Sequence, residues 1–115
     1  MSSANCLFCT FVSRDIEPDV VGETEHSLAF RDVNAQAPTH VLVVPKRHVA
    51  NAGELAEASA EELQDLVLLA RSVAEDEGLV GDYRLVFNTG AGAGQSVFHA
   101  HLHLLGGRAM KWPPG

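Results

Sequence analysis

The chain has 115 residues, of which 46% are hydrophobic and 20% charged, a composition that suits one globular domain with a single core. Its formal net charge of −7 argues against binding to nucleic acid, which normally needs a basic face. No apolar run approaches the roughly 20 residues that cross a bilayer, which argues against a membrane protein. Residues 1–5 show no secretion signal, so we expect a cytoplasmic protein, and we expect these residues to be disordered.

Apolar segments in the first half of the chain predict three strands. The first is short and lies at residues 20–21 before a glycine, and the second covers residues 27–30. The third covers residues 40–45, a nearly continuous apolar run that is bounded by prolines. Such runs are typical of central strands that are buried on both faces.

A long helix is predicted over residues 59–77. Ser59 and Glu62 have the spacing of a capping box, in which each side chain accepts a hydrogen bond from the other residue's amide. Apolar residues then recur at helical spacing. Residues 83–88 alternate in the manner of a strand, and residues 83–105 predict a hairpin with a long loop. Together these elements predict an α+β domain with an antiparallel sheet of about five strands and one main helix.

Three histidines alternate near the end of the chain, at His99, His101 and His103. Alternate side chains of a strand share one face, so the three imidazoles would form a row on the open face of the sheet. The opposite, apolar face would then be the buried one. That face would be formed by Phe98, Ala100, Leu102 and Leu104.

A glycine-rich loop precedes this predicted strand, with Gly90, Gly92 and Gly94 at alternate positions. Glycines let the backbone turn sharply and leave its amides exposed, and exposed amides can form a concave anion site. The row of histidines by itself is open to three interpretations: a metal site, a nucleophilic imidazole that attacks phosphorus, or a polar strand face. The loop and Ser96 favour chemistry on a phosphate, with the central His101 as the nucleophile.

Cys6 and Cys9 are the only cysteines of the chain and form a Cys-x-x-Cys motif. In an intracellular protein such a pair is more typical of half a metal site, or of two free thiols, than of a structural disulfide. The residues around the pair do not decide between these two states.

The segment His99-Ala-His101-Leu-His103-Leu-Leu resembles the signature of the histidine triad (HIT) superfamily. Residues 37–48 resemble a second block of that superfamily, and residues 94–98 and 112–115 are similar to its Hint branch. The resemblance implies a HIT-like fold for a single domain over residues 1–115, dimerising into a continuous sheet. Residues 108–115 would be a C-terminal tail at the dimer interface and the active site. The implied activity is hydrolysis of the P–N bond of purine nucleoside 5′-phosphoramidates.

The resemblance also implies roles for individual residues. His101 would attack the α-phosphorus and form a nucleotidyl-histidine, and His103 would donate a hydrogen bond to the phosphate oxygens. Ser96 would lie by the leaving group, and His40 would orient the triad. Asp32 would accept hydrogen bonds from the ribose hydroxyls. The implied nucleotide contacts are Phe8, Ile16, Phe30, Asp32, Val33, Asn88, Gly94, Gln95, Ser96, His101, His103 and, from the second subunit of a homodimer, Trp112.

Other members of the superfamily bind zinc through residues that match Cys6, Cys9, His48 and His99. Two thiolates and two imidazoles would form a closed tetrahedral structural site. The reaction would then rest on His101 and His103 and need no metal. Two other functions stay open, a dinucleoside polyphosphate hydrolase like the Fhit branch and a zinc-stabilised nucleotide-binding interaction module. The sequence does not rank adenine against guanine.

Overall fold

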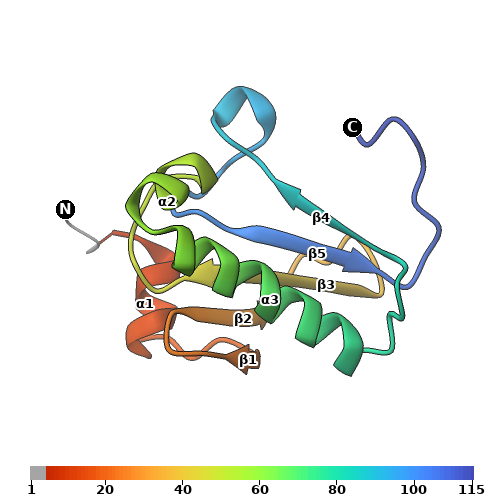
Figure 1. Ribbon diagram of the computed structural model, residues 1–115, viewed down its shortest axis with the longest axis horizontal. Helices are drawn as coiled ribbons and strands as arrows, with labels where there is room; N and C mark the ends of the chain where they lie inside the picture. Colours follow the sequence, from red (N-terminus) through yellow and green to blue (C-terminus); the bar gives the residue numbers. More distant parts are fainter. Residues whose placement is uncertain (1–4) are drawn as a thin grey trace.

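The computed structural model describes residues 5–115, so the predicted disorder of residues 1–4 lies outside the described residues, whereas Asn5 is placed in a turn. Within them the chain forms a five-stranded antiparallel sheet in the order β1-β2-β3-β5-β4 (Figure 1). The strands are β1 (Val20–Glu23), β2 (Ser27–Arg31), β3 (Thr39–Pro45), β4 (Tyr83–Phe87) and β5 (Leu102–Gly106). The helices are α1 (Leu7–Ser13), α2 (Ala52–Ala58), α3 (Ala60–Asp76) and the short 3-10 helix η1 (Ala91–Ala93). The predicted α+β architecture is therefore confirmed.

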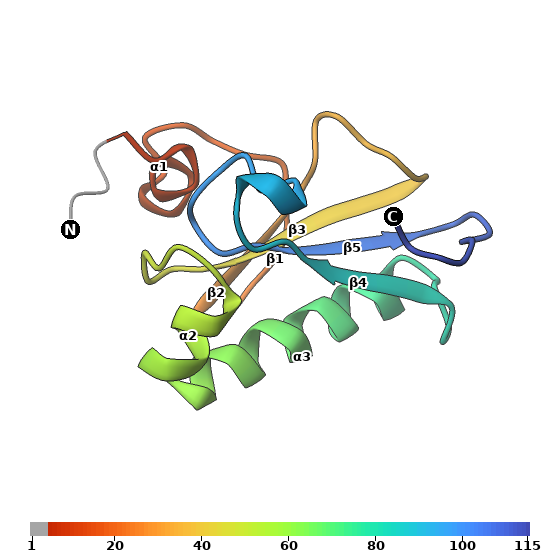
Figure 2. The ribbon, with the colours of Figure 1, turned by 90° about the horizontal axis from the view of Figure 1, so that it is seen from above.

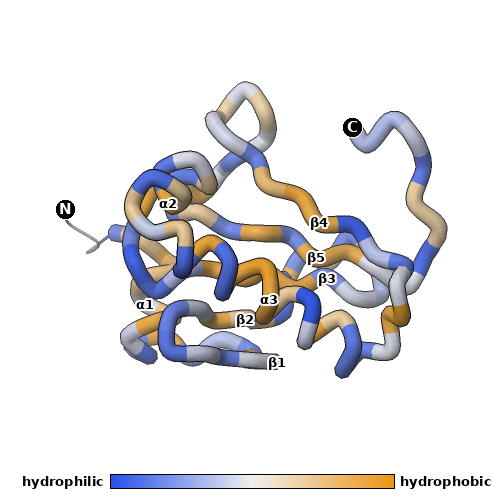
Figure 3. Tube along the Cα trace, viewed as in Figure 1, coloured by the Kyte–Doolittle hydropathy of each residue, from blue (hydrophilic) through white to orange (hydrophobic). Residues whose placement is uncertain are grey.

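The sheet separates two apolar clusters. Figure 2 shows α2 and α3 on one face of the sheet and α1 with the glycine-rich loop on the other. The cluster under α3 consists of Ala29, Val41, Val43, Leu55, Leu66, Leu69, Ala70, Val73, Ala74, Leu102 and Leu104. The cluster under α1 consists of Phe8, Leu28, Phe30, Leu42 and Val44. Because alternate residues of β2 and β3 contribute to the two clusters, both faces of these strands are buried, and apolar residues concentrate along the central strands (Figure 3).

The N-terminus of α3 forms only half of the predicted capping box. The Ser59 hydroxyl accepts from the Glu62 amide at 3.1 Å, as expected. The Glu62 carboxylate does not turn back to Ser59, and instead accepts from Arg47 at 2.9 and 2.8 Å. Two reasons combine: the bidentate ion pair is stronger than a bond to a neutral amide, and the Ser59 amide already donates to Leu55 at the end of α2.

Two short helices, α1 and α2, were not predicted. The N-terminus of α2 is capped by Asn51, whose side chain accepts from the Glu54 amide at 2.9 Å, while the Glu54 carboxylate accepts from the amide of Ala50, the residue before the cap, at 3.0 Å. Helix α1 begins with a sulfur cap, in which Cys6 Sγ accepts from the Cys9 amide at 3.4 Å. No helix formed by residues 5–115 has the length and apolar character to span a bilayer.

The strand that carries the histidines begins later than predicted. Leu102 pairs with Val43 of β3 and with Phe87 of β4, and the ladder does not extend to earlier residues. Within β5 the prediction is confirmed, since Leu102 and Leu104 are buried toward α3. It is wrong for Phe98, which is 51% exposed, because residues 96–101 precede the ladder and do not follow its alternation.

Candidate functional site

Three histidines meet on the sheet face opposite α3. His40 lies on β3 and His103 on the neighbouring β5, where His103 pairs with Leu42. His40 Nε2 lies 3.0 Å from His103 Nδ1. The His101 ring follows at 5.0 Å from the His103 ring, measured between centroids. The structure therefore brings His40, His101 and His103 together, as predicted.

The hydrogen bonds of His40 determine which nitrogen of His103 carries a proton. The Gln36 amide donates to His40 Nδ1 at 3.0 Å, so the proton of a neutral His40 is on Nε2. That Nε2–H donates to His103 Nδ1, which leaves the proton of His103 on its own Nε2. Burial lowers the pKa of His103 to about 4, helped by the neighbouring His101 and His40, and burial also lowers the pKa of His40. Both rings are thus neutral near pH 7.

Asp32 lies directly after β2 and beside this pair. One carboxylate oxygen, Oδ2, is 3.4 Å from His40 Nε2, and the other, Oδ1, accepts from the Asn34 amide at 2.8 Å. The backbone amide of Asp32 donates to the His40 carbonyl at 3.0 Å, which ties the turn to β3. A carboxylate only accepts hydrogen bonds, so the contact with Asp32 also requires a proton on His40 Nε2.

His101 presents a bare nitrogen. Its Nδ1 lies 2.8 Å from the His99 carbonyl oxygen and must donate to it, so the lone pair of the neutral ring is on Nε2. No hydrogen bond from residues 5–115 reaches that Nε2, and no fully buried side-chain nitrogen or oxygen among these residues lacks a partner. The Nε2 atom therefore reaches the protein surface, although the residue is only 8% exposed.

The predicted open row of three imidazoles is wrong in two respects. His101 is packed between Phe8 and His103, so it is a buried ring with one accessible edge. His99 is fully buried and its ring lies among Cys6, Cys9 and His48. The reason is again the late start of β5, because His99 lies outside the strand and its side chain is free to take another direction.

Four ligand atoms converge at this second location, which we call the Cys/His cluster: Cys6 Sγ, Cys9 Sγ, His48 Nδ1 and His99 Nδ1. His99 Nδ1 lies 3.4 Å from Cys6 Sγ, 3.5 Å from Cys9 Sγ and 3.1 Å from His48 Nδ1. The His99 Nε2–H donates to the Pro45 carbonyl at 2.8 Å, so His99 Nδ1 is the unprotonated nitrogen. Burial lowers the pKa of His99 to about 4, which keeps this nitrogen available as a ligand.

These separations fit a tetrahedral metal site. Zinc bonds of about 2.3 Å to sulfur and about 2.0–2.1 Å to nitrogen would place S and N ligands about 3.6 Å apart and two nitrogens about 3.3 Å apart. The observed Cys9 Sγ–His48 Nδ1 distance is 3.3 Å, the three contacts of His99 Nδ1 are 3.1, 3.4 and 3.5 Å, and all four ligand atoms lie within 4.8 Å of one another. No disulfide joins Cys6 and Cys9. The hydrogen bond from His99 to Pro45 is the outer contact that orients a ligating imidazole.

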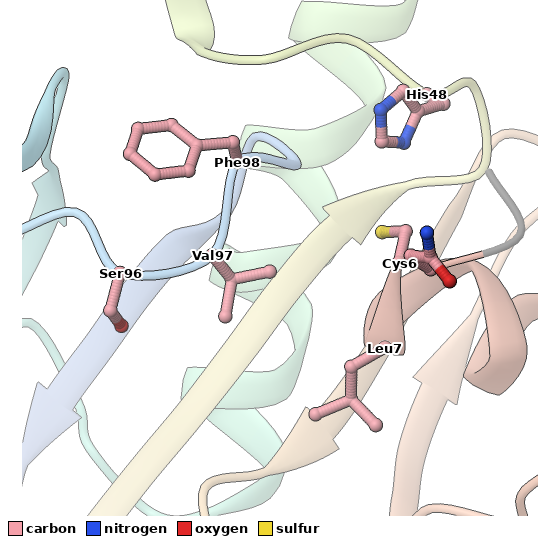
Figure 4. A pocket seen from close by; sticks show the side chains of 7 residues that line it. Cys6, Leu7, His48, Ser96, Val97 and Phe98 are labelled. Atoms are coloured by element: carbon pink, nitrogen blue, oxygen red, sulfur yellow. The ribbon is translucent and has the colours of Figure 1, made fainter. Parts of the chain in front are cut away.

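A pocket of about 440 Å³ lies beside the Cys/His cluster (Figure 4). Cys6 and His48 lie on one side of it, and Ser96 and Val97 lie on the other (Figure 4). The predicted catalytic Ser96 is exposed here, and among residues 5–115 no hydrogen bond joins it to a histidine of the triad. The full lining is Asn5, Cys6, Leu7, His48, Ser96, Val97 and Phe98.

A second pocket, of about 300 Å³, has a mainly apolar wall between α1 and β2 and gathers most of the predicted base contacts. Ile16, Phe30, Asp32 and Val33 all line it. Phe8 does not, because it is 4% exposed and lies behind the wall against His101. The full lining is Leu7, Phe11, Ile16, Glu17, Pro18, Asp19, Phe30, Arg31, Asp32, Val33 and Leu42.

The glycine-rich loop satisfies several of its own amides, so it leaves fewer of them uncovered than predicted. The Gly90 amide donates to the Gln95 side-chain oxygen at 2.8 Å, and the amides of Gly94 and Gln95 donate back into the turn. Gln95 is 3% exposed, and its side-chain nitrogen donates to the Ala50 and Val97 carbonyls at 2.7 and 3.0 Å. Gln95 therefore holds the loop together and has no donor left for a phosphate.

The amides that remain available lie within the loop and just after it. Those of Ala91, Gly92 and residues 96–98 donate to no acceptor within residues 5–115. Asn88 lies beside the loop, near Gly94, where its side-chain nitrogen would be 3.9 Å from a Cβ at that position. An anion site at this loop would thus use the backbone amides of Ala91 and Gly92 or those of residues 96–98.

Comparisons with known proteins agree with this geometry. The HIT domain family matches residues 13–110. The chain is 48% identical to an uncharacterized HIT-like protein of Synechococcus elongatus over 98% of this chain and 99% of that protein. The chain belongs to the HIT superfamily.

Two further relatives of this HIT chain are named for zinc binding and for hydrolase activity. A 14 kDa zinc-binding protein of Zea mays is 47% identical over 95% of this chain and 87% of that protein. The crystal structure of a HIT family hydrolase from Legionella pneumophila is 49% identical and superposes with a TM-score of 0.91, covering 96% of this chain and 100% of that chain. The HIT fold predicted from the histidine signature is therefore confirmed.

The C-terminal tail of the HIT chain does not reach the histidines of its own subunit. Trp112 is 83% exposed. The tail is tied to the sheet instead, since Arg84 donates to the Lys111 carbonyl at 2.9 Å and Arg108 donates to the Gln36 carbonyl at 3.0 Å. The prediction that Trp112 contacts a second subunit stays a prediction.

Several groups at the HIT site were missed from the sequence. Leu7 and Phe11 of α1 line the apolar pocket, and they lie four residues apart, on one face of the helix. The Gln36 amide and the His99 and Pro45 carbonyls orient the imidazoles. No sequence signal marks these, because any residue supplies a backbone amide or carbonyl.

Proposed function

We propose that this protein hydrolyses the P–N bond of purine nucleoside 5′-phosphoramidates through a covalent intermediate on His101. The observation that carries the proposal is the complementary protonation of two neighbouring rings. His101 has a lone pair on an accessible Nε2, while His103 has a proton on its Nε2. One ring is thus prepared to attack phosphorus and the other to donate to the phosphate oxygens.

In the first step His101 Nε2 attacks the α-phosphorus and the P–N bond breaks. The amine leaves with a proton from water. The imidazole becomes cationic, and its charge is stabilised because Nδ1–H donates to the His99 carbonyl. Charge on the non-bridging oxygens is stabilised by His103 Nε2–H and the available amides of residues 96–98. In this proposal Ser96 lies by the leaving group.

In the second step a water molecule attacks the same phosphorus and the bond to His101 Nε2 breaks. The products are the nucleoside 5′-monophosphate and a neutral His101, and the second proton of the water passes to solvent. Because an imidazole that is cationic when attached to phosphorus is a good leaving group, the intermediate need not accumulate.

The apolar pocket is proposed to hold the purine. Its wall between Ile16 and Phe30 suits a flat aromatic base, and the exposed Val33 also lines it. Asp32 lies both at this pocket and beside His40, so the ribose hydroxyls would meet a carboxylate between the base and the phosphate.

The Cys/His cluster is proposed to hold a structural zinc. The donor set is closed, with four protein ligands and two orienting contacts, so no position is left for a reacting group. When bound, zinc supplies a tetrahedral cross-link that joins α1 to the segments at His48 and His99. Cysteines that are not joined by a disulfide also suit a reducing compartment such as the cytoplasm.

We also propose a homodimer in which β4 strands pair. The two edges of the sheet are β1 and β4, and β1 is short and bulged between Val20 and Gly22, which makes it a poor template for pairing. β4 is regular and carries the partly exposed Leu85. Light scattering of the purified protein tests this, and a monomer at micromolar concentration would contradict it.

The decisive experiment is mass spectrometry of the protein after rapid mixing with adenosine 5′-phosphoramidate and acid quenching. We expect a nucleotidyl adduct that peptide mapping assigns to His101, together with release of the amine. A dinucleoside polyphosphate is assayed in parallel, because preference for that substrate would favour a Fhit-like hydrolase. Nucleotide binding without turnover of either substrate would favour an interaction module and would reject the proposed reaction.

A further inference from the structure

Phe8 lies between the Cys/His cluster and the nucleophile. It follows Cys6 and precedes Cys9 on α1, and it is 4% exposed. Its ring contacts His101 edge-on, with 5.1 Å between centroids and 78° between planes. It makes a similar contact with His99 at 5.9 Å. One aromatic ring therefore touches both the proposed nucleophile and the residue whose carbonyl orients it.

We propose that Phe8 is a positioning residue for His101, held in place by the cysteines on either side of it. This inference rests on the proposed function of His101. The hydrogen bond to the His99 carbonyl restrains only one edge of the imidazole. The second side-chain torsion of histidine is broad, so one hydrogen bond does not define the ring plane. Packing against the Phe8 ring supplies the second restraint and keeps Nε2 at the accessible edge.

The position of Phe8 depends on how α1 is held. A helix of seven residues is too short to be stable by itself. It is attached at one end by Cys6 and Cys9, which face His99 Nδ1 at 3.4 and 3.5 Å. Ligation of a metal by this cluster would fix the helix directly beside Phe8. His99 would then act twice, through its ring on the cysteines and through its carbonyl on His101.

Phe11 offers a matched control on the same helix. Its ring contacts Phe8 at 6.1 Å and Phe30 at 5.0 Å, so it belongs to the same aromatic group. It lines the apolar pocket, and within the described residues its ring contacts no histidine. Replacing either phenylalanine by leucine removes one ring from α1, but only Phe8→Leu removes the contact with His101.

The first test separates kcat from KM. We expect Phe8→Leu to lower kcat about tenfold for adenosine 5′-phosphoramidate with KM changed less than about twofold, because His101 loses its orientation while the pocket wall stays. Phe11→Leu should do the reverse and mainly raise KM. Equal effects of the two variants on kcat would reject a positioning role for Phe8, because they would show a shared structural contribution.

The second test reads the ring of His101 directly and does not depend on activity. Imidazole ¹⁵N shifts at one fixed, mildly alkaline pH report which nitrogen carries the proton. In the zinc-loaded protein we expect a single Nδ1–H form of His101 for the wild type and Phe11→Leu. For Phe8→Leu, and for wild type after chelation of zinc, we expect a mixture of the two protonated forms or broadened signals.

Failure of the positioning role of Phe8 and failure of the proposed phosphoramidase activity give different results. Wild-type His101 spectra in folded Phe8→Leu would overturn the inference, even if the enzyme is a phosphoramidase. Absence of a His101 adduct in the wild type would reject the proposed function, and the ¹⁵N spectra would still decide whether Phe8 orients the ring. If Phe8→Leu does not fold, Phe8→Met keeps more of the buried volume and is measured in its place.

Discussion

The protein contains two groups of histidines that differ in what the second ring nitrogen does. In the Cys/His cluster, His99 Nε2–H donates a hydrogen bond to the Pro45 carbonyl. The unprotonated Nδ1 of His99 therefore faces two sulfurs and another imidazole nitrogen. In the pair formed by His40 and His103, a backbone amide occupies one nitrogen of His40, so a proton is directed from ring to ring.

In each group, the backbone hydrogen bonds determine which ring nitrogen carries the proton. They therefore determine whether a histidine offers a lone pair to a metal or holds a proton for a neighbouring ring. Four lone pairs that converge on one point favour a cation. A row of donors and acceptors that alternate favours a defined protonation state. Only Ala100 lies between His99 of the Cys/His cluster and His101, which packs beside His103, and the His99 carbonyl accepts from His101 Nδ1.

The largest expected effect is on turnover in His101→Asn. The substitution removes the bare Nε2 and should lower kcat by more than about 10³-fold, while nucleoside monophosphate binding and the midpoint of thermal unfolding stay close to wild type. The measurement is steady-state hydrolysis of adenosine 5′-phosphoramidate together with calorimetry. His26→Asn is the matched control, because His26 lies outside both groups, and it should keep wild-type turnover. Substantial hydrolysis by His101→Asn would mean that another group attacks phosphorus.

A smaller loss is expected when the donor to His103 is removed. His40→Ala should lower kcat by about 10²-fold, because His103 then loses the contact that keeps its proton on Nε2. His40→Gln retains an N–H at about the position of His40 Nε2 and should recover much of that loss. If the two variants have the same kcat, the hydrogen bond between the rings does not matter for turnover.

Removal of a ligand from the Cys/His cluster should act mainly on stability. We expect Cys9→Ser to lower the zinc content and the free energy of unfolding by about 3–4 kcal/mol, the gain that a ligand present at about a thousand times its dissociation constant provides. For a domain of this size that corresponds to roughly 10–20 °C in the unfolding midpoint. A chelator should destabilise the wild type similarly and Cys9→Ser hardly at all. A chelator effect of equal size in both proteins would argue against the assigned ligand.

The smallest effect concerns acid. Burial lowers the pKa of His103 to about 4, below the value of about 6.5 for an unfolded histidine, so the unfolded chain binds the proton first as pH falls. The stability that His103 contributes is therefore complete above about pH 6.5 and is lost as pH decreases toward 4. The unfolding midpoint of His103→Gln should fall less between pH 7 and pH 4.5 than that of the wild type. Parallel curves for the two proteins would show that His103 is not buried in its neutral form.

Much of the fold followed from local pattern. The apolar run before Pro45 predicted the central strand, and Ser59 with the helical spacing after it predicted α3. The two short helices were missed for different reasons. Asn51, with Glu54 three positions later, is a visible start signal for α2 that was overlooked. Helix α1 is capped by a sulfur, and its residues show no pattern that excludes other conformations.

The site was predicted less completely, and its errors share one cause. The residues were identified by type and spacing, and the structure does assemble both histidine groups. The direction of His99 and the exposure of Phe98 were wrong because alternation was extended beyond the first paired residue of β5. Gln95 was assigned to phosphate because its neighbours are glycines, whereas its side chain fills the loop.

The sequence by itself determined the chemistry that is available: three alternating histidines, a pair of cysteines and an apolar scaffold of five strands and a helix. Only the tertiary structure decided which nitrogen of each ring is bare. That choice depends on three backbone groups: the Pro45 carbonyl, which reaches His99 from β3, the Gln36 amide beside His40, and the His99 carbonyl beside His101. Backbone groups are the same in every residue, so their use is a consequence of chain geometry and leaves no mark in the order of side chains.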